Sequence, residues 1–124
     1  MTNKKSLVLG LAVFLTILGA GLTLQASEGE DVTVQGEILD MACYVAHEAK
    51  GPDHAGCAKK CVKGGQPMGL LAEDGTVYLL YASHENGDAF EKAKEHAGEQ
   101  VELTGAMATQ AGVKGIEVHS VKGI

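Results

Sequence analysis

The 124-residue chain has no arginine and no tryptophan, and its aromatic residues are limited to three tyrosines and two phenylalanines. Proteins that bind phosphate backbones need clustered positive charge. Because this chain lacks arginine and carries a net charge of −6, we expect no nucleic acid partner. With so few aromatic side chains, the core must be built from Val, Leu, Ile, Met and Ala. Cysteine is also scarce: there are three, an odd number that internal disulfides alone cannot satisfy.

Several motifs that would identify a catalytic or cofactor-binding protein are missing from the sequence. There is no C-x-x-C-H, so a c-type haem is not expected, and no C-x-x-C that would support a thioredoxin-like redox pair. No Ser-His-Asp set, paired-carboxylate cleft or phosphate-binding glycine loop can be argued either. The sequence therefore assigns no catalytic residue and does not indicate an enzyme.

The N-terminus has the pattern of a secretory signal. Lys4 and Lys5 precede an uncharged, largely apolar run over residues 6–24, and Ala26 ends an acceptable cleavage site. We expect residues 1–26 to be removed; the alternative is an uncleaved membrane anchor, because about 17–25 apolar residues can span a bilayer. All sixteen acidic residues and eight of the ten lysines follow this segment, so the exported part carries 8 − 16 = −8 charges. The predicted location is the periplasm or the cell surface, with membrane contact only through an uncleaved N-terminal segment.

The remaining residues predict one small, mainly β domain. After a flexible leader over residues 27–31, alternating apolar and polar residues indicate strands at 32–40 and 100–107, with a last strand around 116–121. Two apolar runs at 67–72 and 76–81 flank an Asp-Gly, which is typical of a hairpin.

A helix is expected between the third and fourth strands. Asp88 is the predicted N-cap with Glu91 as its capping-box partner, Phe90, Ala93 and Ala97 form the apolar stripe, and Gly98 ends the helix. This order of elements predicts an OB-like five-stranded barrel over residues 32–124, with a helical insert at 41–65 after the first strand.

The insert contains the residues that carry chemistry: Cys43, His54, Cys57 and Cys61. On a helix that starts at Pro52 or Asp53 and runs to about Lys63, the last three of these fall at i, i+3 and i+7 and share one face. Three thiolates and one imidazole form a Cys₃His set that suits zinc and also tolerates copper(I). A closed four-ligand site leaves no position for water, which argues against metal-dependent hydrolysis. We expect a transition-metal site with a structural or metal-handling role.

Two alternatives remain open at the level of sequence. In an oxidising compartment Cys43 could pair with Cys57 or Cys61, which would leave one free thiol in a disulfide-stapled module that docks onto an envelope protein. The third possibility is a thiol redox protein that uses a free cysteine against a disulfide.

The other polar residues near the insert are weaker candidates. His47 follows Cys43 at i+4, and His84 follows the third strand, so both are secondary candidates for metal ligands. We expect His96 to lie on the solvated side of its helix. Asp40 is expected either to cap the next turn or to accept a hydrogen bond from a ligating histidine.

The strings G-E-I-L-D-M-A-C-Y, H-A-G-C-A-K-K-C-V-K-G-G-Q-P-M-G-L-L and D-G-T-V-Y-L-L carry a family resemblance. With them the chain resembles a group of small, largely uncharacterised exported bacterial OB-like domains, over nearly all of the part that follows residue 31. The resemblance implies an exported OB-like domain with a thiol–histidine site at Cys43, His54, Cys57 and Cys61.

Overall fold

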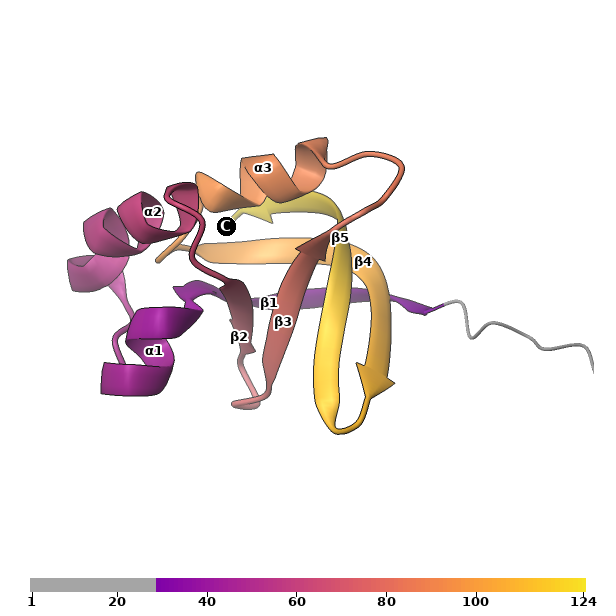
Figure 1. The fold of residues 1–124 in the computed structure, drawn as a ribbon, viewed down its shortest axis with the longest axis horizontal. Helices are drawn as coiled ribbons and strands as arrows, with labels where there is room; N and C mark the ends of the chain where they lie inside the picture. The colour runs from indigo at the N-terminus through magenta and orange to yellow at the C-terminus, as the bar shows by residue number, and fades with distance from the viewer. Residues whose placement is uncertain (1–28) are drawn as a thin grey trace, which may run out of the picture.

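A computed structural model describes residues 29–124 of the chain; the predicted signal segment, residues 1–26, and the start of the leader lie outside the described residues. Figure 1 shows a small barrel of strands with two helices at one end and a third helix lying across the top. The elements in chain order are β1 (Glu30–Asp40), α1 (Met41–His47), a 3₁₀ turn (Pro52–His54), α2 (Ala55–Lys63), β2 (Met68–Ala72), β3 (Val77–Ala82), α3 (Asp88–Lys94), β4 (Gln100–Gln110) and β5 (Val113–Gly123).

The five strands close into a barrel in the order β1-β2-β3-β5-β4, which confirms the predicted OB-like architecture. Neighbouring strands are antiparallel except β3 and β5, which run parallel. β1 is long enough to serve two neighbours, since its first part pairs with β4 and its last part with β2. Gly36 pairs with both Ala72 and Val101 where the two ladders meet. A Cβ there would lie 2.8 Å from the carbonyl carbon of Leu71, so a glycine is needed at this crossing.

The core is aliphatic, as the composition predicts. The helices contribute small side chains to it: Ala58 and Val62 from α2, Ala93 from α3 and Ala97 just beyond α3, each no more than 1% exposed. The strands supply most of the remaining buried side chains: Ile38, Met68, Leu70, Leu80, Val101, Leu103, Ile116, Val118 and Val121. The insert helix α2 is therefore part of the domain core and packs against the barrel.

Three boundaries differ from those that the sequence predicts. β1 begins at Glu30, because Glu30 and Asp31 pair with β4, so the expected leader over residues 27–31 ends earlier. β4 and β5 extend beyond the strands expected at 100–107 and 116–121, because their ladder continues to Gln110 and Val113 and leaves only a two-residue turn between them. Ala111 and Gly112 both have positive φ (50° and 83°), as the tight turns of hairpins require.

The predicted N-cap of α3 is wrong. Asp88 is already the first residue of the helix, the cap position is Gly87, and no side chain caps that end. Instead the Asn86 Oδ1 accepts a hydrogen bond from the Asp88 backbone N–H at 2.9 Å, which is the local turn that asparagine favours. The helix also ends earlier than predicted, at Lys94 rather than at Gly98, so Ala97 lies beyond it. Ala93 and Ala97 are both fully buried against the barrel, as expected of the apolar stripe.

Between residues 29 and 124, no helix combines the length and the apolar character that crossing a bilayer requires.

Candidate metal centre

The candidate site lies in the β1–β2 connection, where α1 and α2 sit side by side at one end of the barrel (Figure 1). Asp40, the last residue of β1, fixes the first half. Its Oδ1 accepts hydrogen bonds from the backbone N–H groups of Ala42 (3.0 Å) and Cys43 (3.5 Å), and it thereby caps α1. Cys43 is therefore held in the first turn of α1, directly beside the end of the strand.

The second half of the site is built by the 3₁₀ turn and α2. His54 ends the turn, and Cys57 and Cys61 follow on α2 one helical turn apart, with their Sγ atoms 3.9 Å from each other. Ala58 and Val62, the residues that follow each cysteine, are buried in the core and fix the rotation of the helix. This alternation of a cysteine and a core residue directs the thiols away from the barrel centre.

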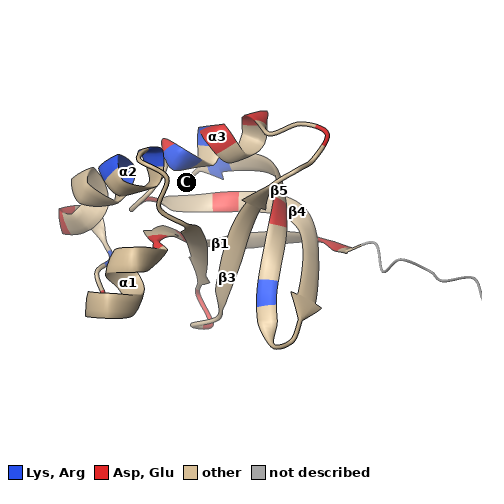
Figure 2. Cartoon of the chain, viewed as in Figure 1, with Lys and Arg blue, Asp and Glu red and all other residues tan. Residues whose placement is uncertain are grey.

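Contacts with the segment after α3 hold α2 in place. Lys59 forms an ion pair with Glu99, and Lys63 forms one with Glu95 at 2.8 Å. Figure 2 shows the positive residues of α2 in its C-terminal half, where α3 is adjacent. Gly98, with φ of 79°, lies against the first residue of α2, and its backbone N–H donates to the Ile38 carbonyl oxygen at 2.7 Å.

The cysteines and His54 lie in two overlapping groups of donors that share Cys43. The Sγ atoms of Cys43 and Cys57 lie within 4.8 Å of each other and of a ring nitrogen of His54. Cys43 Sγ is also within 4.8 Å of Cys61 Sγ. Together with the 3.9 Å between Cys57 and Cys61, the three sulfurs form a triangle with no side longer than 4.8 Å. Thiolates at about 2.3 Å from a tetrahedral zinc ion stand roughly 3.8 Å apart, so these groups lie near enough to hold a metal ion.

Asp40 belongs to the same cluster. One of its carboxylate oxygens lies within 4.8 Å of Cys43 Sγ and Cys61 Sγ. Among residues 29–124, two buried side-chain polar atoms have no hydrogen-bond partner, and they are Asp40 Oδ2 and His54 Nε2. Leaving a buried polar atom unpaired costs about 1–3 kcal/mol, so both atoms mark a place where a ligand would be favourable.

The thiols and the carboxylate influence each other's protonation. The Asp40 carboxylate beside Cys43, together with burial and the neighbouring thiols, raises the pKa of Cys43 to about 12. Burial and contacts with Cys57 and Asp40 raise the pKa of Cys61 as well. Burial also acts to raise the pKa of Asp40, but donors from Cys43, Ala42 and Cys61 outweigh it and hold that pKa below the usual value. Cys43 and Cys61 therefore keep their protons at neutral pH in the metal-free protein, and metal binding would release them.

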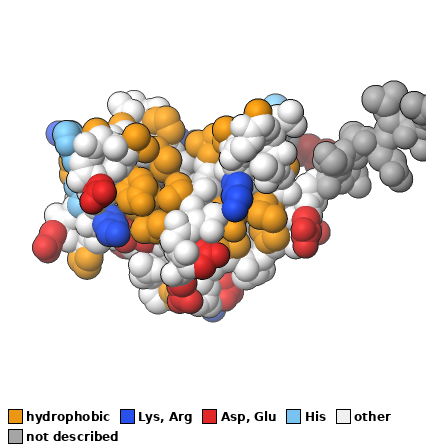
Figure 3. Space-filling view, turned by 90° about the horizontal axis from the view of Figure 1, so that it is seen from below, with side chains coloured by type: hydrophobic (Ala, Val, Ile, Leu, Met, Phe, Trp, Pro, Cys, Tyr) orange, Lys and Arg blue, Asp and Glu red, His pale blue; other side chains and the backbone are white. Residues whose placement is uncertain are grey.

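All three cysteines are free in the described part of the chain, so neither of the predicted disulfide pairings is formed. Cys57 is exposed, whereas Cys43 and Cys61 are half-buried. Figure 3 shows histidine side chains at the surface of the end that carries α1 and α2.

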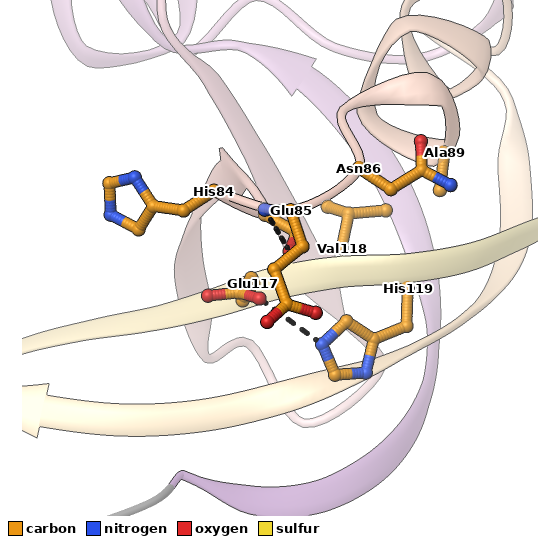
Figure 4. A pocket seen from close by; sticks show the side chains of 8 residues that line it. His84, Glu85, Asn86, Ala89, Glu117, Val118 and His119 are labelled. Atoms are coloured by element: carbon orange, nitrogen blue, oxygen red, sulfur yellow. Dashed lines mark hydrogen bonds and ion pairs between the residues drawn. The ribbon is translucent and has the colours of Figure 1, made fainter.

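The remaining histidines lie outside both donor groups. His47 is exposed in the last turn of α1. His84 is exposed in the β3–α3 loop, where it lines a hollow of about 560 Å³ with Glu117 and His119 (Figure 4). The expectation that His96 is solvated is wrong: it is half-buried, and its Nδ1 lies 3.1 Å from Glu99 Oε2.

Asp40 is the residue whose importance the sequence understated. Asp40 caps α1, which confirms one of the two roles predicted for it. One of its carboxylate oxygens, however, lies near the thiols of Cys43 and Cys61 rather than beside a ligating histidine. The only signal for this in the sequence is its position three residues before Cys43.

Comparisons of the chain with models of known families, with curated proteins and with solved structures find no match. The fold and the site therefore define the class on their own: an OB-like barrel whose first inter-strand connection carries a cluster of cysteines and a histidine close enough to hold a metal ion.

Proposed function

We propose that this protein is an exported domain that binds one transition-metal ion through Cys43, His54, Cys57 and Cys61. Zinc is the preferred ion and copper(I) the alternative. The observation that carries the proposal is the close approach of three sulfurs from two separately anchored segments, with an imidazole nitrogen of His54 near two of them. Unpaired thiols of high pKa have no evident structural use in such an arrangement, whereas metal-bound thiolates do.

The surroundings of the cluster support this proposal. The His54 Nε2 is buried and lacks a hydrogen-bond partner, although a buried imidazole nitrogen is normally paired. An ion at the cluster would also bridge α1 to α2 and close the β1–β2 connection. Such a bridge would add stability to a domain of this size, which has a limited core.

The cellular setting of the proposal comes from the sequence. The predicted signal over residues 1–26 favours the periplasm or the cell surface, and the resemblance to exported OB-like domains favours the same place. In that setting the ion would either stabilise the fold or be held for delivery or detoxification.

Native mass spectrometry of the reduced protein with added zinc tests the proposal. We expect one bound ion and three reduced thiols. His54→Ala should weaken zinc binding at least tenfold, because it removes one of four ligands. His47→Ala is the matched control: it removes an exposed histidine from the same insert and should leave the affinity unchanged.

The opposite results are equally clear. A loss of two daltons with no bound metal in the untreated protein would favour the disulfide-stapled interaction module. Equal zinc affinities for the His54 and His47 variants would remove His54 from the ligand set.

A further inference from the structure

The aspartate at the end of β1 is the feature of the cluster that the proposed ligand set leaves unused. Asp40 is 1% exposed, and its two oxygens have different surroundings. Oδ1 accepts the N–H groups of α1, which fixes the orientation of the carboxylate. Oδ2 is buried and has no partner. It is this carboxylate that lies within 4.8 Å of the sulfurs of Cys43 and Cys61.

We propose that Asp40 is the specificity-determining residue of the metal centre, and that it makes the site select a zinc-class divalent cation over copper(I). This inference rests on the proposed function, because it concerns the same ion. The carboxylate would act, through its charge and its oxygen, on the ion held by the four proposed ligands, a role which the three thiolates and the imidazole cannot perform.

The chemistry of the two ions gives the reason. Zinc accepts carboxylate oxygen at about 2.0–2.2 Å alongside sulfur and nitrogen. Copper(I) is soft and is satisfied by thiolates alone, so an oxygen donor contributes little to its binding. Three thiolates bind both ions well and do not discriminate between them. The oxygen of Asp40 discriminates, because it is a donor that favours the zinc-class ion.

Charge acts in the same direction as donor type. At equal distance, a negative charge attracts a dication with twice the energy of a monocation. Asp40 is shielded from water, and within residues 29–124 it forms no ion pair; the α2 residues Lys59 and Lys63 are paired with Glu99 and Glu95. The carboxylate is therefore available to the bound ion, and its effect is larger for zinc than for copper(I).

The test compares the affinities of the full protein for Zn²⁺ and Cu⁺, each measured anaerobically by competition with a chromophoric chelator. Asp40→Asn removes the charge and retains an amide oxygen that can cap α1. We expect this variant to lose zinc affinity by roughly 10–100-fold, the range seen when groups that support metal ligands are removed. Its copper(I) affinity should fall by less than about threefold.

Asp53→Asn is the matched control, because it removes one negative charge from an exposed position in the same insert. It should leave the ratio of the two affinities unchanged. If Asp40→Asn fails to fold by circular dichroism, Asp40→Ser replaces it, since serine is also a good N-cap and has no carboxylate.

The outcomes separate this inference from the proposed function. If wild-type protein binds zinc but Asp40→Asn lowers the zinc and copper(I) affinities equally, or lowers neither, only the proposed selectivity of Asp40 is overturned. Wild-type protein that binds neither ion with its thiols reduced overturns the proposed function, and the selectivity with it.

Discussion

Gly98 is the residue whose substitution tests most directly how the candidate metal centre depends on the barrel. It has φ of 79°, a conformation that disfavours any residue with a Cβ. A Cβ built there would also lie 2.7 Å from the Ala55 Cβ, at the first residue of α2. We predict that Gly98→Ala destabilises the metal-free protein in two ways: backbone strain of about 1–2 kcal/mol and overpacking of about 1–3 kcal/mol.

Together, backbone strain and overpacking should lower the free energy of unfolding by about 2–5 kcal/mol. For a domain of this size each kcal/mol lowers Tm by roughly 4–8 °C, so the melting temperature should fall by about 10 °C or more. Because α2 carries Cys57 and Cys61, its displacement should also weaken zinc binding. Thermal unfolding monitored by circular dichroism gives the first quantity, and zinc competition gives the second.

Gly112→Ala is the matched control. Gly112 also has positive φ, 83°, but a Cβ there would meet nothing within 4 Å. It should cost only the strain of about 1–2 kcal/mol and leave zinc affinity unchanged. Equal destabilisation by the two substitutions, or normal zinc binding by a destabilised Gly98 variant, would refute the reasoning that Gly98 sets the position of α2.

Three further predictions follow from the described contacts. Val62→Ala should lower the free energy of unfolding by about 2 kcal/mol in urea, since it removes fully buried methyl groups, whereas Val113→Ala, 57% exposed in wild type, should change it by less than about 0.5 kcal/mol. In the metal-free reduced protein at pH 8, iodoacetamide should modify exposed Cys57 well before Cys43, whose pKa is raised to about 12 by Asp40 and burial, and peptide mapping would reveal the order. In the folded protein the pKa of Asp40 lies below its usual 3.8, because its hydrogen-bond donors outweigh the effect of burial. The Asp40 carboxylate therefore contributes its full stabilisation of the metal-free protein above pH 3.8, and this stabilisation is lost as the pH falls through the lower folded pKa. Urea titrations from pH 5 to 2 should show a steeper loss of stability for wild type than for Asp40→Asn.

Much of the fold was predictable because its signals are local. Alternating residues gave the strands, the Asp-Gly between two apolar runs gave the β2–β3 hairpin, and the periodicity of α3 gave its buried face. The error at Asp88 has a physical cause. Asn86 and Asp88 are both good turn-forming residues within three positions, and the chain used the asparagine as a local turn where a cap had been expected.

Part of the candidate site was likewise predictable from local signals, and part depended on tertiary packing. The spacing of Cys57 and Cys61 predicted that they share one face of a helix, which α2 confirms, whereas His54 lies in the 3₁₀ turn that precedes α2. The nearness of Cys43 to them could not be derived from spacing, because it depends on how α1 and α2 pack after β1. The half-buried environment of His96 was missed for a related reason, since it depends on Glu99 and on the end of β5 near Gly123.

The sequence by itself determined the residue types of the cluster, the helical face that carries most of them, and the barrel into which they are inserted. Only the tertiary structure decided that the Asp40 carboxylate lies within 4.8 Å of the Cys43 and Cys61 sulfurs, and that Gly98 packs against Ala55 of α2, 43 positions away in the chain. The reason is physical. Local propensity depends on residues that are neighbours in the sequence. Barrel closure and core packing, in contrast, determine how a strand end, two short helices and a turn come into contact. These bring together groups that no periodicity connects.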